Sequence, residues 1–292
     1  MGFWNALFGG TQLTPEEEER ERQAKQFDLL KYDGVRAMKT DQADYALRCF
    51  TEALKLRDDL EVHEHLSQVL LHKGELDEAM AHLEVLATAE PANVAVKKTM
   101  ARVAYMKEDY AAMQALCEEG LSIDGQDVQL FFLSGQALSG QGNPVGAIAM
   151  LTKAIALRDD FADAYLLRGQ TLLSMGDVNS ASQDAQWLTD QVGDQEDVLL
   201  FKAKVEERQG NIGQAVKTYD RLIEVNPFST EGYEGRGRLK LSLGDKAGAE
   251  ADMQKVLELD PQRLADVSGE YSAEGIEQRV KQAYSFINPL GL

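Results

Sequence analysis

Small or aliphatic residues recur along this chain at an almost constant interval, and this period constrains the fold more than any other feature. The interval is 33 residues once and then 34 residues five times in succession. The positions that define it are Ala46, Ala79, Met113, Ala147, Ala181, Ala215 and Ala249. Self-similarity at a period of about 20 to 50 residues is typical of an array of stacked units rather than of one globular core.

Each unit carries the pattern of two short helices. The units begin near residues 27, 60, 94, 128, 162, 196 and 230, and a turn such as "KGEL" or "QGNP" divides each one into two amphipathic segments. The eighth residue of every unit is small, so we expect the first helix to approach its partner closely there. These residues are Gly34, Ser67, Ala101, Gly135, Gly169, Ala203 and Gly237. Because one short helix pair cannot bury both of its faces, we expect seven pairs to stack around a continuous core.

The same positions carry a family resemblance. The segments Ala46–Phe50 and Ala215–Tyr219 read A-x-x-x-F and A-x-x-x-Y, and Pro91, Pro227 and Pro261 stand at the ends of units. With the period and the small residue of the first helix, this pattern resembles the tetratricopeptide repeat over residues 27–263. The resemblance implies an all-α fold, a right-handed α-solenoid of about seven helix-turn-helix units. We expect the solenoid to occupy residues 14–263.

The two ends of the chain differ from the repeats. Thr14, Pro15 and Glu17 have the spacing of a capping box with proline at the first helical position, which predicts that the first helix extends back to residue 14. Residues 264–292 are expected to form a capping helix, near 272–287, and a short tail. Residues 1–13 form an apolar arm, and we expect it to dock on a neighbouring surface, a second copy of the chain or a membrane interface. The contact residues expected in this arm are Phe3, Trp4, Leu7 and Phe8.

Composition narrows the classes of partner. The formal net charge is −19, which disfavours binding to nucleic acid or to an anionic membrane. No stretch has the roughly 20 apolar residues of a membrane span. The chain has only two cysteines, and its start lacks the basic region of a signal peptide, so we expect a cytoplasmic protein.

The sequence shows no enzyme signature. Four histidines gather in one region, His63, His65, His72 and His82, but Ser67 stands where an H-E-x-x-H zinc motif needs its second histidine. Cys49 and Cys117 have the character of packing residues, because a free cysteine behaves as a small hydrophobe. We therefore expect no catalysis, no metal and no cofactor, with metal binding by the histidines as a weaker alternative.

The resemblance also implies where a partner binds. In this family the first helices line a concave groove, and the fifth, ninth, twelfth and thirteenth residues of each unit point into it. Those positions hold seven basic residues and only three acidic ones. The predicted groove residues are Lys98, Arg102, Tyr105, Phe132, Leu166, Leu173, Leu200, Lys204, Arg208 and Arg238. We expect a non-catalytic scaffold that binds a peptide or protein segment with apolar and acidic residues. The alternative is a self-assembling or membrane-adjacent assembly factor that acts through the arm as a homo-oligomer.

Overall fold

All regular structure in residues 14–261 is helical. The computed structural model describes these residues, and the predicted arm of residues 1–13 and the predicted capping helix and tail lie outside them. Fourteen helices occur in this range, and no strand does. This arrangement confirms the predicted class, an all-α solenoid of helix-pair repeats. The helices form two compact units that divide after Gln141.

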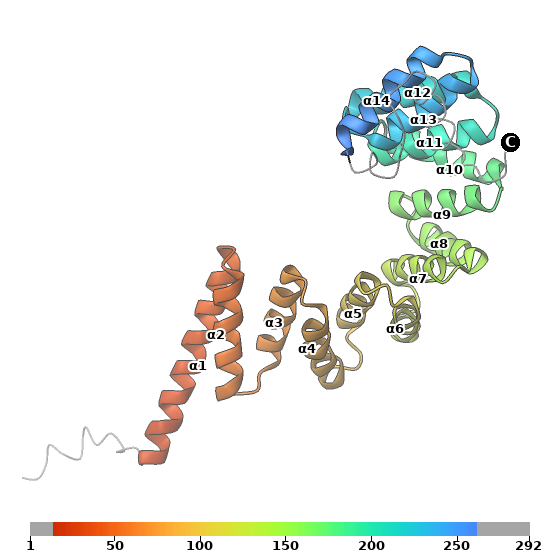
Figure 1. The fold of residues 1–292 in the computed structure, drawn as a ribbon. Helices are drawn as coiled ribbons and strands as arrows, with labels where there is room; N and C mark the ends of the chain where they lie inside the picture. Colours follow the sequence, from red (N-terminus) through yellow and green to blue (C-terminus); the bar gives the residue numbers. More distant parts are fainter. Residues whose placement is uncertain (1–13, 262–292) are drawn as a thin grey trace, which may run out of the picture. The chain divides into compact units, whose positions relative to one another are not determined.

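Within each unit, consecutive helices pack against one another in chain order, as Figure 1 shows most clearly for α1 to α4. The first unit contains α1 (Pro15–Lys39), α2 (Ala43–Leu56), α3 (Leu60–Lys73), α4 (Leu76–Ala89), α5 (Val94–Met106), α6 (Tyr110–Ile123) and α7 (Val128–Gly140). The second unit contains α8 (Pro144–Leu157), α9 (Ala162–Ser174), α10 (Val178–Gln191), α11 (Glu196–Arg208), α12 (Ile212–Val225), α13 (Thr230–Ser242) and α14 (Lys246–Leu259).

The helix boundaries follow from capping residues. The first helices after α1 begin at the predicted unit starts, from Leu60 of α3 to Thr230 of α13. Asp127 caps α7 by accepting a hydrogen bond from the Leu130 amide at 2.9 Å. The predicted capping box is present, since the Thr14 side chain accepts from the Glu17 amide and the Glu17 carboxylate accepts from the Thr14 amide.

The core of each unit lies between the two helices of a repeat and the first helix of the next. The fourth residue of every second helix is buried, from Ala46 to Ala249, as are all the small eighth residues of the first helices. The ring of Phe50 on α2 fills the space beside Gly34, where a Cβ would lie only 2.6 Å from its Cε1 atom. Small residues on one helix therefore accommodate large rings on the next, as close packing requires.

Two buried ion pairs, which the sequence did not predict, join helices in the second unit. The Arg168 guanidinium on α9 donates to both carboxylate oxygens of Asp184 on α10, at 3.0 and 2.6 Å. Two repeats further along the chain, Arg236 on α13 donates to both carboxylate oxygens of Asp252 on α14, at 2.9 and 2.5 Å. Both aspartates are almost fully buried, so their charges need compensation, which Arg168 provides for Asp184 and which Arg236 and Lys240, the latter at 2.9 Å, provide for Asp252.

Candidate peptide-binding face

The surface formed by the first helices of the repeats, here called the first-helix face, comprises α1, α3, α5 and α7 in the first unit. In the second unit it comprises α9, α11 and α13. The predicted basic positions lie on these helices, but most of them bind acidic groups of the adjacent repeat. These ion pairs determine which charged groups of the face remain free.

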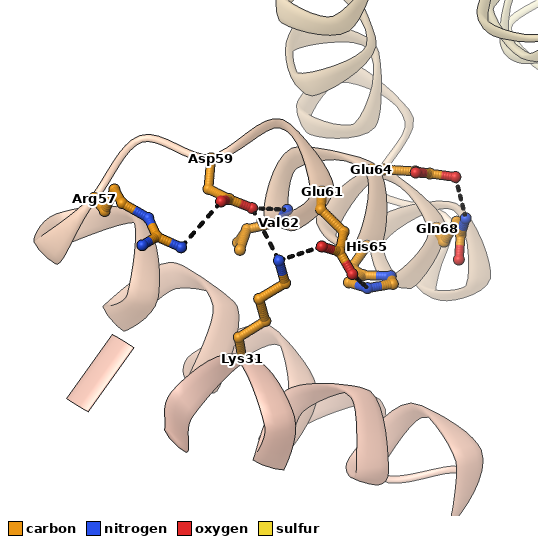
Figure 2. A network of polar contacts seen from close by, with 8 residues as sticks. All are labelled: Lys31, Arg57, Asp59, Glu61, Val62, Glu64, His65 and Gln68. Atoms are coloured by element: carbon orange, nitrogen blue, oxygen red, sulfur yellow. Dashed lines mark hydrogen bonds and ion pairs between the residues drawn. The ribbon is translucent and has the colours of Figure 1, made fainter. Parts of the chain in front are cut away.

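Lys31 on α1 shows how adjacent repeats are joined. Its ammonium group lies 3.2 Å from Asp59 Oδ1 and also pairs with Glu61 (Figure 2). Asp59 caps α3 through the Val62 amide at 3.3 Å and receives a further bond from Arg57. Burial raises the pKa of Asp59. The hydrogen bond and the charge of Lys31, together with the cap bond from Val62, lower it by a larger amount, so the pKa of Asp59 lies below its ordinary value.

Lys98 on α5 makes the same arrangement two repeats later, within the first compact unit. Its ammonium donates to Asp127 Oδ2 at 2.7 Å, and Asp127 is the cap of the next first helix, α7. Burial raises the pKa of Asp127, and the bonds from Lys98 and the Leu130 amide lower it by more, so the pKa lies below its ordinary value. A lysine at the fifth position thus binds the helix cap of the following repeat in both cases.

The ninth positions also bridge adjacent first helices. Arg102 donates to Gln129 Oε1 at 3.0 Å within the first unit. Lys204 lies 3.5 Å from Glu231 in the second unit, and Arg238 pairs with Glu207. Among the described residues, only Arg102 and Arg208 of the predicted groove cations have no carboxylate within ion-pair distance. The predicted basic excess is therefore largely used in contacts between repeats.

The predicted apolar positions fall into three groups by exposure: exposed, half-buried and buried. Tyr105 and Met106, at the end of α5, are 45% and 54% exposed. Phe132, Leu166 and Leu200 are half-buried, and the last two pack on core clusters that include residues of the following repeat.

Leu173 differs from the prediction, because only 8% of its surface is exposed and it belongs to the core of the second unit. Leu173 and Phe201 of α11 belong to the same core cluster, and Gly169, one turn before Leu173, leaves room for the Phe201 ring against α9.

The four histidines do not converge. His63 Nδ1 lies 2.7 Å from His82 Nδ1, and His63 Nε2 lies 2.8 Å from Asp58 Oδ1. His65 instead stacks on Phe50 with ring centroids 5.2 Å apart, and His72 is exposed. Within residues 14–261 no three metal-ligating side chains form a group. The histidine pair joins α3 to α4.

Cys49 and Cys117 are free and buried, and burial raises the pKa of the Cys117 thiol to about 12. In the described range, no helix combines the length and apolar character needed to cross a bilayer. The predicted arm residues lie outside the described residues, so self-association through them stays a prediction.

Comparisons with known proteins agree with this architecture. A model of the tetratricopeptide repeat family matches residues 34–94, 132–186 and 202–263. The chain is 23% identical over 209 residues to the DnaJ homolog subfamily C member 3 of Gallus gallus, over 62% of this chain and 42% of that protein. It spans less than half the length of the curated relatives it matches.

Two solved structures illustrate the similarity of fold. A tetratricopeptide repeat protein from Parabacteroides merdae has a TM-score of 0.69 at 13% identity, over 88% of this chain and 98% of that one. YrrB, described as a tetratricopeptide repeat protein with an unusual peptide-binding site, has a TM-score of 0.52 at 12% identity, over 62% of this chain and 94% of its own. At these identities the likeness concerns the fold alone.

Proposed function

The chain belongs to the tetratricopeptide repeat family, and from that premise we propose that it is a non-catalytic scaffold that binds a peptide or protein segment on its first-helix face. The observation that carries this proposal is the exposure of Tyr105 and Met106 at the end of α5. The Tyr105 ring packs edge-on against Tyr110 of the same repeat, with ring centroids 6.1 Å apart, yet about half of its surface stays exposed beside Met106. Adjacent exposed apolar side chains of this size are typical of interaction surfaces. YrrB, which shares the fold, is described as binding peptides.

The charges around this patch favour a segment that carries both apolar and acidic residues. Arg102 lies one turn before Tyr105 on α5, and its hydrogen-bond partner among residues 14–261 is the neutral side-chain amide of Gln129 on α7. Its positive charge is thus available to a carboxylate of a bound segment, and a guanidinium binds a carboxylate through two parallel hydrogen bonds. The net charge of −19 argues against nucleic acid as the partner. The two free buried cysteines fit a reducing compartment such as the cytoplasm.

A substitution of exposed residues tests this function without disturbing the core. The double variant Tyr105→Ala, Met106→Ala removes the patch, while Phe132 is less suitable because it is half-buried. We expect affinity capture with the variant to lose partners that the wild-type chain retains, because the apolar contact area of the partner is gone. Phe228→Ala, at a residue that is 75% exposed before α13, is the matched control and should retain them. An identical set of partners for all three proteins would overturn the proposal.

A further inference from the structure

A cavity of about 310 Å³ lies in the first unit among α3, the end of α4 and the start of α5. Its apolar lining includes Leu83, Leu86 and Val96, which are buried core residues. Glu64 and Glu90 also line it, and both are exposed. The volume falls at the lower end of the range that small ligands or single side chains occupy.

The negative charge at this cavity is not compensated within the described part of the chain. A third lining carboxylate, Glu61, is neutralised by Lys31. Glu64, by contrast, accepts only a long bond from Gln68, at 3.4 Å, and Figure 2 shows both side chains directed away from Lys31. Glu90 accepts from the Asn93 amide group at 2.7 Å. No lysine or arginine is among the lining residues.

We propose that this cavity binds a lysine or arginine side chain of the segment that the first-helix face recognises. The inference rests on the proposed function and adds one requirement to the partner. The apolar stem of such a side chain fits against Leu83 and Val96, while its charged end reaches Glu64 and Glu90. An acidic side chain is rejected here, because it would bring a third uncompensated negative charge to the two glutamates. The partner therefore carries a basic residue among its apolar and acidic ones.

The full-length chain can be tested with three fluorescein-labelled peptides that differ at one position. Each peptide has the core Leu-Xaa-Leu between Gly-Ser flanks, with arginine, citrulline or glutamate as the central residue. Citrulline has nearly the shape of arginine but no charge. We expect fluorescence anisotropy to give a Kd about tenfold lower for the arginine peptide than for the other two, as charge-assisted hydrogen bonds imply.

Two double variants assign the preference to the cavity. Glu64→Gln, Glu90→Gln should raise the Kd of the arginine peptide to that of the citrulline peptide, with unchanged circular dichroism because both residues are exposed. The control Glu78→Gln, Glu84→Gln removes two charges of α4 that are also exposed but lie outside the cavity, and it should leave the Kd unchanged.

Equal binding of all three peptides, absence of binding by the arginine peptide, or an unchanged Kd in the Glu64, Glu90 variant would overturn the inference. If partner capture still depends on Tyr105 and Met106 in those cases, the proposed function stands and only the cavity assignment fails.

Discussion

At the scale of single residues, the small eighth position determines how closely helices pack. The sequence predicted that this residue lets a first helix approach its partner, and Gly34 does so against Phe50 of α2. At Gly169 a different neighbour is closest. A Cβ there would collide with the Phe201 ring, which comes from the first helix of the next repeat, and would lie 3.1 Å from Asp184 Cβ. Gly169 therefore controls stacking between repeats as well as pairing within one.

Gly169→Leu should destabilise the second unit by about 1 to 3 kcal/mol, because the added side chain must displace the buried Phe201 ring. Urea denaturation followed by circular dichroism measures the change. Gly213→Ala is the control, since a Cβ at that position of α12 meets no atom within 4 Å and alanine favours a helix over glycine. Equal unfolding midpoints for the Gly169 variant and the wild type would show that this packing is misassigned.

The histidine pair should make stability depend on pH. Burial, and secondarily the positive charge of His63, lower the pKa of His82 below its ordinary value of 6.5. The unfolded chain then takes up a proton near pH 6.5 that the folded chain does not. Stability should be constant above that pH and fall as the pH decreases from 6.5 towards the folded pKa.

Urea midpoints at pH 7.5, 6.5 and 5.5 test this dependence. His82→Gln should flatten the profile, whereas His72→Gln, at an exposed histidine, should leave it as in the wild type. A wild-type profile that rises as the pH decreases would contradict the sign of the effect.

At the scale of elements, the turn inside each helix pair needs one residue with left-handed backbone. Glycine occupies that position in five repeats, with φ between 71° at Gly142 and 86° at Gly244. Asp41 and Glu108 occupy the equivalent positions of the other two, at φ of 56° and 57°. Side chains other than glycine adopt this conformation at an energetic cost, and aspartate tolerates it better than glutamate. The turn between α5 and α6 is therefore the most strained of the set.

Glu108→Gly should stabilise the first unit by about 1 kcal/mol, because glycine adopts the left-handed conformation without the steric cost of a Cβ. Gly210→Ala makes the opposite change at the equivalent turn of the second unit and should destabilise the chain by a similar amount. Thermal unfolding of both variants beside the wild type measures the two effects. A lower melting temperature for Glu108→Gly would rule out strain at this turn.

At the scale of the whole molecule, the distribution of charge differs from the count along the sequence. The chain carries 49 acidic and 30 basic residues, and the first-helix positions appeared to concentrate the basic ones. Within each unit, most of these cations bind a carboxylate of the adjacent repeat, as Lys98 does with Asp127. They therefore contribute to stacking, and few cations of the first-helix face are left for a partner. Among the seven basic first-helix positions, all within the described residues, Lys39 and Arg102 in the first unit and Arg208 in the second have no carboxylate partner.

The sequence alone determined the all-α repeat, the starts of the helix pairs and the capping box at Thr14, because these depend on local periodicity and on hydrogen bonds between residues close in the chain. Only the tertiary structure decided which side chains of the first-helix face are available. Leu173 shares its helical position with exposed Tyr105, yet it is buried in a core cluster that includes Phe201 of the next repeat. Lys98 is paired with Asp127, 29 residues further along. The physical reason is that burial and ion pairing depend on the neighbouring repeat, whose approach is not encoded in the periodicity of one helix.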